Sequence, residues 1–215
     1  MNFDLFDTST VEGTETLGRH ACVLRRFALP FAHEIAQAMK AIEAAAPFRH
    51  MVTSRGHTMS VALTNCGELG WVSDRRGYRY SAMDPATGRP WPAMPQAFRQ
   101  LAAEAAQQAG LGHFEPDACL MNRYLPGSGM GLHQDRNEKS LIEPIVSVSL
   151  GIPAVFLFGG CKRTDKPRRV PLFHGDVVVW GGEDRMRFHG ILPLKPAHHG
   201  ELGAQRYNLT FRRAG

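Results

Sequence analysis

The segment IVSVSLGIPAVFLFGG, residues 145–160, contains two short runs of branched and aromatic side chains, separated by Gly151 and Pro153. Branched and aromatic side chains pack well on the pleated surface of a β-sheet, and glycine and proline commonly bound strands. The segment therefore predicts two consecutive short strands.

Similar runs fill the chain from about residue 117, each bounded by glycine, proline or charged residues. They are ACLMNRY (118–124), RVPLFHG (169–175), DVVVWGG (176–182), RFHGILPL (187–194) and RYNLTFRR (206–213). Many short strands at this spacing favour a β-sandwich or a jelly roll.

Two amphipathic helices are expected before this region, in ALPFAHEIAQAMKAIEAAAPF (28–48) and MPQAFRQLAAEAAQQAG (94–110). Each begins near a proline and carries apolar side chains on one face. These side chains are Phe31, Ile35, Met39 and Ile42 in the first helix and Phe98, Leu101, Ala102 and Ala105 in the second. The segment between them holds one predicted strand, TMSVALT (58–64), and then turns rich in aromatic residues and arginine. The expected fold class is mainly β with flanking helices (α+β).

The composition is that of an ordinary globular domain, with 215 residues, 43% of them hydrophobic and 21% charged, so we expect one domain. No apolar run approaches the roughly 20 residues of a membrane span, and the acidic start MNFDLFDTST does not resemble an export signal, so a cytoplasmic location is expected. The four cysteines form no CxxC pair, which argues against a zinc site of the usual spacing and against a disulfide scaffold. The formal net charge of +5 comes mostly from arginine and is compatible with a polyanionic partner.

A candidate metal site begins at His133 and Asp135 in GLHQDRNE (131–138). In an extended segment these two side chains point to the same face, so both can reach one metal ion. His189 lies in a β-type run about five strands further along, and a jelly roll can bring such distant strands side by side. Two histidines and one carboxylate leave three positions of a metal open, which is the arrangement of non-heme iron(II) oxygenases. Zinc also accepts these ligands, but oxygen chemistry requires the open face.

A second HxD pair, His174 and Asp176, lies in FHGDVVVW (173–180). Gly175 and Asp176 are typical of a turn that leads into a strand. The later histidines follow within about one hairpin. We therefore predict that this pair has a structural role.

The segment RYNLTFRR places four polar side chains on one strand face, because residues two apart in a strand point the same way. They are Arg206, Asn208, Thr210 and Arg212. Two guanidinium groups aimed at one cavity suit a dicarboxylate, since each can hold a carboxylate with two parallel hydrogen bonds. Asn122 and Tyr124 in NRY likewise share a face. The alternative is an edge strand with a solvated face, but in combination with the metal-ligand set the dicarboxylate is favoured.

The segment between the two helices interleaves aromatic residues with arginines. The aromatic residues are Trp71, Tyr78 and Tyr80, and the arginines are Arg75, Arg76 and Arg79. Such a mixture offers stacking surfaces and phosphate contacts to a nucleic acid. The alternative is that Trp71 and Tyr78 are half-buried packing residues.

The ordered set of NRY, HQD, a distal histidine and RxNxTxR resembles the AlkB family of iron(II)- and 2-oxoglutarate-dependent dioxygenases, and its bacterial repair enzymes in particular. The resemblance runs over most of the chain, from FRHMVTSRGHTMSVALTN (48–65) to RYNLTFR (206–212). It implies a single dioxygenase domain of residues 1–215. Within it, a double-stranded β-helix (jelly-roll) core covers about residues 117–213, and a nucleotide-recognition lid covers about residues 48–92.

The resemblance also implies roles for individual residues. The implied ligands of the Fe(2+) ion, and so the catalytic residues, are His133, Asp135 and His189. The implied contacts to the co-substrate 2-oxoglutarate are Arg206, Asn208 and Tyr124 at one carboxylate, and Arg212 and Asn122 at the end that chelates iron. O2 is the other implied co-substrate.

Members of this family hydroxylate an N-methyl group on a damaged base, typically 1-methyladenine or 3-methylcytosine, and the product releases formaldehyde. The implied partner is alkylated single- or double-stranded DNA, with RNA as a further candidate; no membrane and no obligate protein partner are expected. A base inside a duplex cannot reach a buried iron, so it must be flipped out or presented single-stranded.

By the same resemblance the base lies between Trp71 and His133, with Tyr78 and Arg163 in substrate contact. We add Tyr80 from the aromatic segment and Asn137, which stands where bacterial relatives often have aspartate. Asparagine still accepts a hydrogen bond but lacks the charge that favours a cationic base, so the preference between adenine and cytosine lesions stays open. His57 stands in the lid where relatives can have an aromatic residue, so the preference between single-stranded and duplex nucleic acid stays open.

Two alternatives remain. A 2-oxoglutarate oxygenase could act on a protein or a small molecule, although the basic, aromatic lid favours nucleic acid. A non-catalytic nucleic-acid-binding module could carry a vestigial metal site, although such a module needs neither three metal ligands nor a dicarboxylate pocket.

Overall fold

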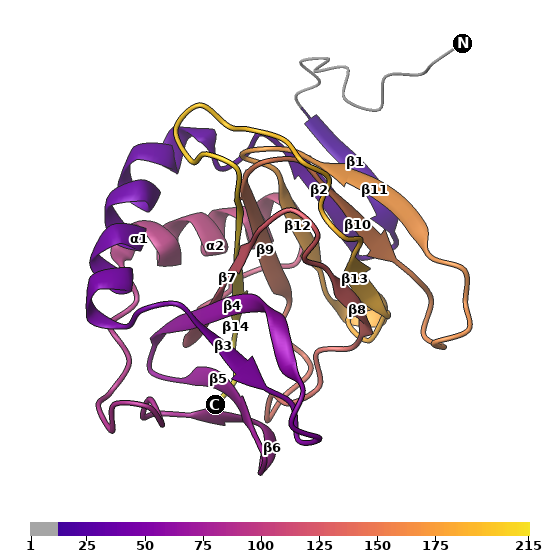
Figure 1. The fold of residues 1–215 in the computed structure, drawn as a ribbon. Helices are drawn as coiled ribbons and strands as arrows, with labels where there is room; N and C mark the ends of the chain where they lie inside the picture. Colours follow the sequence, from indigo (N-terminus) through magenta and orange to yellow (C-terminus); the bar gives the residue numbers. More distant parts are fainter. Residues whose placement is uncertain (1–12) are drawn as a thin grey trace.

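The computed structural model describes residues 13–215. The interpretation of MNFDLFDTST concerned residues outside this range. Two β-sheets face each other, and both helices cover the outer side of the larger sheet (Figure 1). This arrangement confirms the expected class, mainly β with flanking helices, and the jelly-roll core.

The larger sheet has eight strands in the order β1-β2-β12-β9-β14-β7-β4-β3. Their bounds are Gly13–Gly18 (β1), Ala21–Arg25 (β2), Val177–Trp180 (β12), Ile145–Gly151 (β9), Arg206–Arg212 (β14), Ala118–Tyr124 (β7), Thr58–Gly67 (β4) and Arg49–Val52 (β3). The smaller sheet has the order β11-β10-β13-β8, with bounds Arg168–Leu172, Ala154–Phe158, His189–Ile191 and Met130–His133. A separate hairpin pairs β5 (Gly70–Asp74) with β6 (Gly77–Ser81).

The two helices are α1 (Ala32–Ala45) and α2 (Gln96–Gln108), both within the predicted segments. Their predicted apolar faces are buried, except that Phe31 lies in a short 3₁₀ turn, Leu29–Phe31, before α1 and is only partly buried. They pack on the outer face of β9, β14 and β7, where Val146, Val148 and Leu209 belong to the same apolar cluster. The opposite face of these strands is polar and points between the sheets, which is where a site can form.

The sequence did not predict β1 and β2 at the edge of the larger sheet. β2 pairs with β12, about 150 residues later, and its Val23 and Leu24 side chains are buried in the apolar clusters on the two faces of the sheet. A long-range partner leaves little local signal, because strand preference depends on the neighbouring strands. The segment expected to form turns after β4 also contains a regular structure, the β5–β6 hairpin, whose turn includes Gly77 with a φ of +101°.

The structural assignment of the second HxD pair is confirmed. The Asp176 carboxylate is 1% exposed and accepts hydrogen bonds from the Arg25 guanidinium and from the backbone N–H groups of Arg26 and Phe173. The backbone N–H of Gly151 donates to Nδ1 of His174. Both side chains therefore join loops at one end of the larger sheet.

All four cysteines are free; three are buried and Cys161 is exposed. Burial raises the pKa of the Cys22 thiol to about 11, so this group stays protonated and inert at neutral pH. Within residues 13–215 no helix is long and apolar enough to cross a membrane.

We predict that Asp176→Ala lowers the free energy of unfolding by about 3 kcal/mol, because it leaves the Arg25 guanidinium, whose side chain is only 12% exposed, short of one partner. The measurement is urea denaturation. Glu183→Ala is the matched control, since it removes a 2.8 Å ion pair to Arg19 whose side chains are 65% and 74% exposed; such surface pairs contribute about 0–1 kcal/mol. Equal losses in the two variants would contradict the structural role of Asp176.

Candidate active site

The pairing of β8 with β13 sets the two histidines of the candidate metal site side by side. His189, the first residue of β13, pairs with His133, the last residue of β8. Gly190 permits this close pairing, because a Cβ at that position would lie 2.6 Å from the backbone oxygen of Met130. The ring centroids of the two histidines are 4.4 Å apart.

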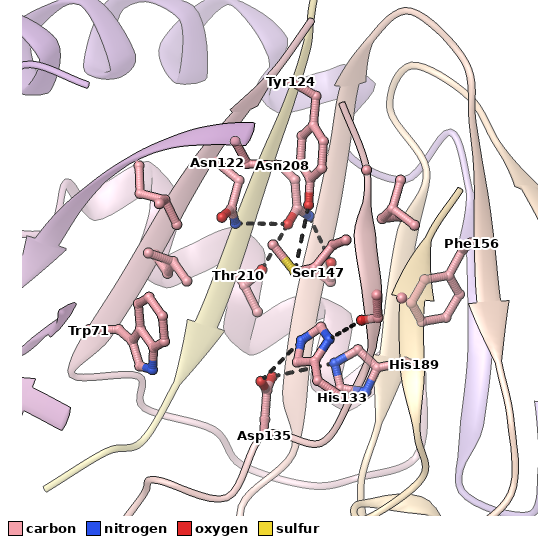
Figure 2. A pocket seen from close by; sticks show the side chains of 18 of the residues that line it. Trp71, Asn122, Tyr124, His133, Asp135, Ser147, Phe156, His189, Asn208 and Thr210 are labelled. Atoms are coloured by element: carbon pink, nitrogen blue, oxygen red, sulfur yellow. Dashed lines mark hydrogen bonds and ion pairs between the residues drawn. The ribbon is translucent and has the colours of Figure 1, made fainter. Parts of the chain in front are cut away.

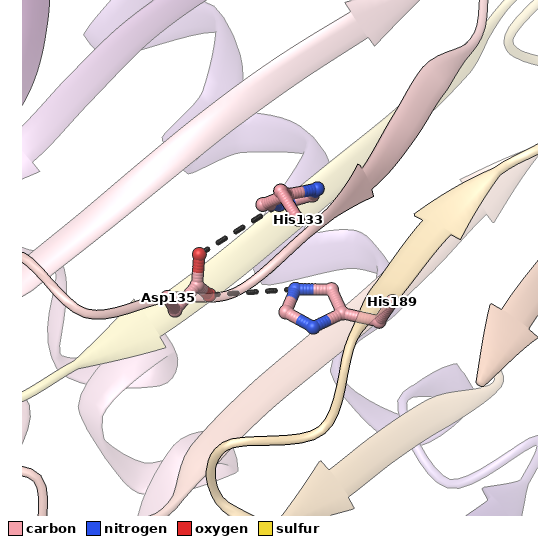
Figure 3. Close-up of side chains that lie close together, drawn as sticks. All are labelled: His133, Asp135 and His189. Atoms are coloured by element: carbon pink, nitrogen blue, oxygen red, sulfur yellow. Dashed lines mark ion pairs between the residues drawn. The ribbon is translucent and has the colours of Figure 1, made fainter. Parts of the chain in front are cut away.

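Asp135 completes the cluster from the loop after β8 (Figure 3). Its Oδ1 lies 3.7 Å from Nε2 of His133, and its Oδ2 lies 3.7 Å from Nε2 of His189. The possible ligand atoms of the three residues all lie within 4.8 Å of one another. The expectation that these residues lie close together is therefore confirmed. Four strands, β9 to β12, separate β8 from β13 in the chain.

Backbone carbonyls fix the tautomer of both histidines. Nδ1 of His133 donates to the Gly131 oxygen at 2.9 Å, and Nδ1 of His189 donates to the Arg187 oxygen at 3.0 Å. Because a carbonyl only accepts, each Nδ1 carries the proton and each Nε2 offers a lone pair to the cluster. Burial and the neighbouring His133 lower the pKa of His189 to about 4, so His189 is neutral at physiological pH and ready to bind a metal.

The Asp135 carboxylate is held by Arg212 of β14. Nε and Nη2 of Arg212 donate to Oδ2 at 3.0 and 2.6 Å. Burial acts to raise the pKa of Asp135, but the interactions with Arg212 first, and then with His189 and His133, together outweigh burial and hold the pKa below its usual value. Asp135 is thus ionised and oriented. A histidine pair with one carboxylate matches the ligands that iron(II) takes in oxygenases.

Arg206, at the start of β14, is 1% exposed and has an unsatisfied guanidinium. Its Nη2 donates to Oγ of Ser149 at 2.9 Å, but Nε and Nη1 are buried with no hydrogen-bond partner among residues 13–215. Its Cζ lies 5.0 Å from the centre of the Tyr124 ring, which pairs with it from β7. A buried cation without an anion is costly, so the site fits a ligand that brings a carboxylate.

Asn208 and Asn122 lie between the two arginines and face each other across β14 and β7 (Figure 2). Asn208 is fully engaged: Nδ2 donates to Ser147 Oγ and the Val148 oxygen, and Oδ1 accepts from Asn122 Nδ2 and Thr210 Oγ1. The Oδ1 atom of Asn122 is buried and has no partner within the described chain. Asn208 therefore orders its neighbours, whereas Asn122 keeps an unused polar atom.

One cavity of about 350 Å³ joins these groups. Its lining includes the three residues of the metal cluster, both arginines and, from the β5–β6 hairpin, Trp71 and Tyr78. The two aromatic rings stack, with centroids 5.4 Å apart and an angle of 21° between their planes. Asn65 of β4 holds the Trp71 backbone by two hydrogen bonds, of 2.9 and 3.0 Å.

The other residues that were predicted to contact the substrate do not all line the cavity. Asn137 lines the cavity. Arg163 is exposed and donates from Nη1 to the Leu132 oxygen at 2.6 Å, beside the start of the metal cluster. Tyr80 is not in the cavity lining, because its hydroxyl donates to Oε1 of Glu138 at 2.7 Å. His57 is exposed in the loop between β3 and β4 and also lies outside the lining.

Sequence reasoning missed several residues that shape the site: Asn65, Glu138, Ser147, Ser149, Phe156, Trp180 and Arg185. The serines carried a usable signal, since Ser147 and Ser149 alternate with valines in IVSVSLG and so mark a polar strand face. The others carried none, because each depends on contacts between distant segments.

Comparisons with known proteins agree with this geometry. Residues 20–212 match the family model of the 2OG-Fe(II) oxygenase superfamily. The alpha-ketoglutarate-dependent dioxygenase AlkB of Escherichia coli (strain K12) is 56% identical over 201 residues, which cover 94% of this chain and 93% of that protein. The nucleic acid dioxygenase ALKBH1 of Mus musculus is 30% identical over 133 residues, covering 62% of this chain and 34% of that protein.

The solved structure of OsALKBH1 superimposes with a TM-score of 0.84 at 28% identity, and the match covers 94% of this chain and 100% of that chain. Its likeness supports the jelly-roll core described above. The family model and the E. coli relative each extend over nearly the whole chain. The chain belongs to the AlkB family within the 2OG-Fe(II) oxygenase superfamily and is an iron(II)- and 2-oxoglutarate-dependent dioxygenase.

Proposed function

We propose that this dioxygenase removes N-methyl groups from alkylated nucleobases, such as 1-methyladenine and 3-methylcytosine, in DNA and also in RNA. The observation that carries the proposal is the stacked Trp71–Tyr78 pair, which forms one wall of the cavity that holds the metal cluster. A flipped base is flat and aromatic, so a stacking wall beside an oxidising centre suits it. The relative named a nucleic acid dioxygenase supports the same substrate class.

Exposed arginines around the cavity support a polyanionic substrate. Arg75 and Arg76 form the turn of the β5–β6 hairpin, and Arg136 and Arg163 are exposed on the loops beside the metal cluster. Such groups contact phosphates and position the strand without reading its sequence. We propose that residues 48–92, which include β3 to β6, act as the nucleotide-recognition lid of the single domain.

Within the cavity we propose His133, Asp135 and His189 as the iron ligands. Arg206 would hold one carboxylate of 2-oxoglutarate, because its unpartnered Nε and Nη1 atoms need an anion.

The Tyr124 ring would pack against the Arg206 guanidinium and hold it in place. Arg212 and Asn122 would face the end of 2-oxoglutarate nearer the metal. Asn208 would act by ordering Asn122 and Ser147, since its own amide is fully engaged. Trp71, Tyr78, Asn137 and Arg163 would contact the substrate.

When bound, iron and 2-oxoglutarate with O2 supply the oxidation that converts an N-methyl group to an N-hydroxymethyl group, and 2-oxoglutarate leaves as succinate and CO2. The protein's own part is to hold the methyl group near the cluster and to exclude bulk water. Trp71 and Tyr78 would position the base, while Arg206 and Arg212 would orient the co-substrate. The hydroxymethyl product then loses formaldehyde and restores the base.

The deciding experiment is formaldehyde release from matched oligonucleotides carrying 1-methyladenine or 3-methylcytosine, as single-stranded DNA, duplex DNA and RNA. Release should require iron and 2-oxoglutarate, and unmethylated oligonucleotides should give none. Methylated peptides test the alternative of a protein substrate. Formaldehyde from the peptides but not from any oligonucleotide would overturn the proposal.

A cytoplasmic location and the absence of an obligate protein partner are further parts of this proposal.

Asp135→Ala is predicted to abolish metal binding and turnover while the protein stays folded, because the cluster loses its only carboxylate. Metal binding is measured by isothermal titration of Mn²⁺, and folding by circular dichroism. Asp176→Ala is the matched control, since it alters the other HxD pair; below its melting temperature it should bind metal normally. Normal metal affinity in Asp135→Ala would show that the ligand set is wrong.

Arg206→Lys is predicted to raise the KM for 2-oxoglutarate roughly ten- to a hundredfold, since the loss of a charge-assisted contact costs about 1.5–3 kcal/mol. Metal affinity should be unchanged. Arg123→Lys serves as the control, because Arg123 points away from the cavity and pairs with Glu43 of α1 at 2.9 Å. An unaltered KM in Arg206→Lys would mean that another group binds the co-substrate.

Trp71→Ala should lower demethylation at limiting oligonucleotide by roughly ten- to a hundredfold, since one stacked base contributes about 1–3 kcal/mol. Slow turnover of 2-oxoglutarate without nucleic acid should persist, because the cluster and both arginines lie on other strands. Succinate and formaldehyde are measured in parallel. If Trp71 were only a packing residue, both products and the melting temperature would fall together.

A further inference from the structure

Two acidic and two basic side chains with little exposure lie together at the candidate metal cluster, and the proposed chemistry does not account for all of them. They are Asp135, Glu138, Arg185 and Arg212, whose side chains are 10%, 2%, 3% and 7% exposed. Glu138 and Arg185 do not line the cavity, so they do not contact a bound substrate.

The four residues form a chain of contacts that ends at Asp135. Glu138 lies 3.2 Å from Nη2 of Arg185 and 3.5 Å from Nε of Arg212. Arg212 holds Oδ2 of Asp135, and Nη1 of Arg185 donates to the Asp135 backbone oxygen at 2.7 Å. The side chain and the backbone of Asp135 are therefore fixed by the two arginines that flank Glu138.

Tyr80 connects this cluster to the β5–β6 hairpin. Its hydroxyl donates to Oε1 of Glu138 at 2.7 Å. In the hairpin Tyr80 pairs directly with Trp71, so the two side chains share one face. The strand pair that carries the aromatic wall of the cavity is thus bonded to the same carboxylate that contacts Arg212.

A buried ionic cluster is a poor way to gain stability, because apolar side chains of similar size usually serve as well or better. Such a cluster instead fixes the orientation of its side chains, because each charged group is held in place by its hydrogen-bond and ion-pair partners. Here the orientation that is fixed is that of Asp135: one oxygen faces Arg212, and the other faces His133.

We propose that Tyr80 and Glu138 are positioning residues that act through Arg212 to orient the Asp135 carboxylate for the metal. The proposal rests on the proposed role of Asp135 as an iron ligand. It also gives Tyr80 a role different from the substrate contact expected from the sequence. The hydrogen bond between Tyr80 and Glu138 then links the hairpin to the metal-ligand loop.

The test is equilibrium titration of the metal-free protein with Co²⁺, followed by its visible absorption, with neither 2-oxoglutarate nor nucleic acid present. Tyr80→Phe removes only the hydroxyl, and Glu138→Gln removes only the charge. Each should weaken Co²⁺ binding by roughly three- to tenfold, at or below the lower end of the effect of groups that support metal ligands. The absorption spectrum should change in both.

Tyr207→Phe is the matched control. Tyr207 is a buried tyrosine of β14 whose ring lies on the helix side of the sheet, beside Phe48. It should keep the native Co²⁺ affinity and spectrum. The double variant Tyr80→Phe/Glu138→Gln should bind Co²⁺ as Glu138→Gln alone does, because groups that act in series are not additive.

Native affinity and spectrum in Tyr80→Phe, with or without a lower melting temperature, would overturn the proposal by showing a purely structural hydroxyl. Independent, multiplying effects in the double variant would also overturn it. If Glu138→Gln fails to fold, Tyr80→Phe alone decides. Asp135→Ala in the same titration separates the two proposals. Native Co²⁺ affinity in that variant refutes the ligand set, whereas loss of binding there with native binding in Tyr80→Phe refutes only the positioning role.

Discussion

The antiparallel pairing of β14 between β9 and β7 is the constraint on which the site depends. Alternation along β14 sends Tyr207, Leu209 and Phe211 toward the helices and the polar residues into the space between the sheets. The register places Tyr124 opposite Arg206. A shift of one residue would exchange the two faces, burying the arginines under the helices. The apolar contact with α1 and α2 therefore fixes the position of the polar groups.

The two arginines of this strand have different electrostatic surroundings. Arg212 is compensated inside the protein by Asp135 and Glu138. Arg206 is as deeply buried but has no carboxylate partner within residues 13–215. Burial lowers the pKa of Arg206, whereas in Arg212 the acidic neighbours outweigh burial and raise it. The cavity is thus preorganised with one unmatched positive charge at a fixed place, which selects an anionic ligand of matching shape.

The cavity has two walls that reach the metal cluster from different parts of the chain. One wall is the jelly roll, which supplies charge and metal ligands. The other is the hairpin, which supplies Trp71 and Tyr78. Asn65 ties the hairpin to β4, and Tyr80 ties it to Glu138. The aromatic wall is thus tied both to the larger sheet and, through Glu138, to the arginine that holds Asp135.

The sequence by itself determined the class of the fold, the two helices, most of the core strands and the identities of the metal-cluster residues. Strand alternation, helix periodicity and the spacing of HQD and RxNxTxR are local patterns, and the ordered set of motifs, which resembles the AlkB family, added the distant His189. Tertiary structure decided the rest. Three features depend on segments that are far apart in the chain. β2 pairs with β12, Arg206 is buried with two of its nitrogen atoms lacking a partner among the described residues, and Tyr80 donates a hydrogen bond to Glu138. Such contacts depend on which strands become neighbours, and that choice is made by burial of the whole core rather than by any short segment.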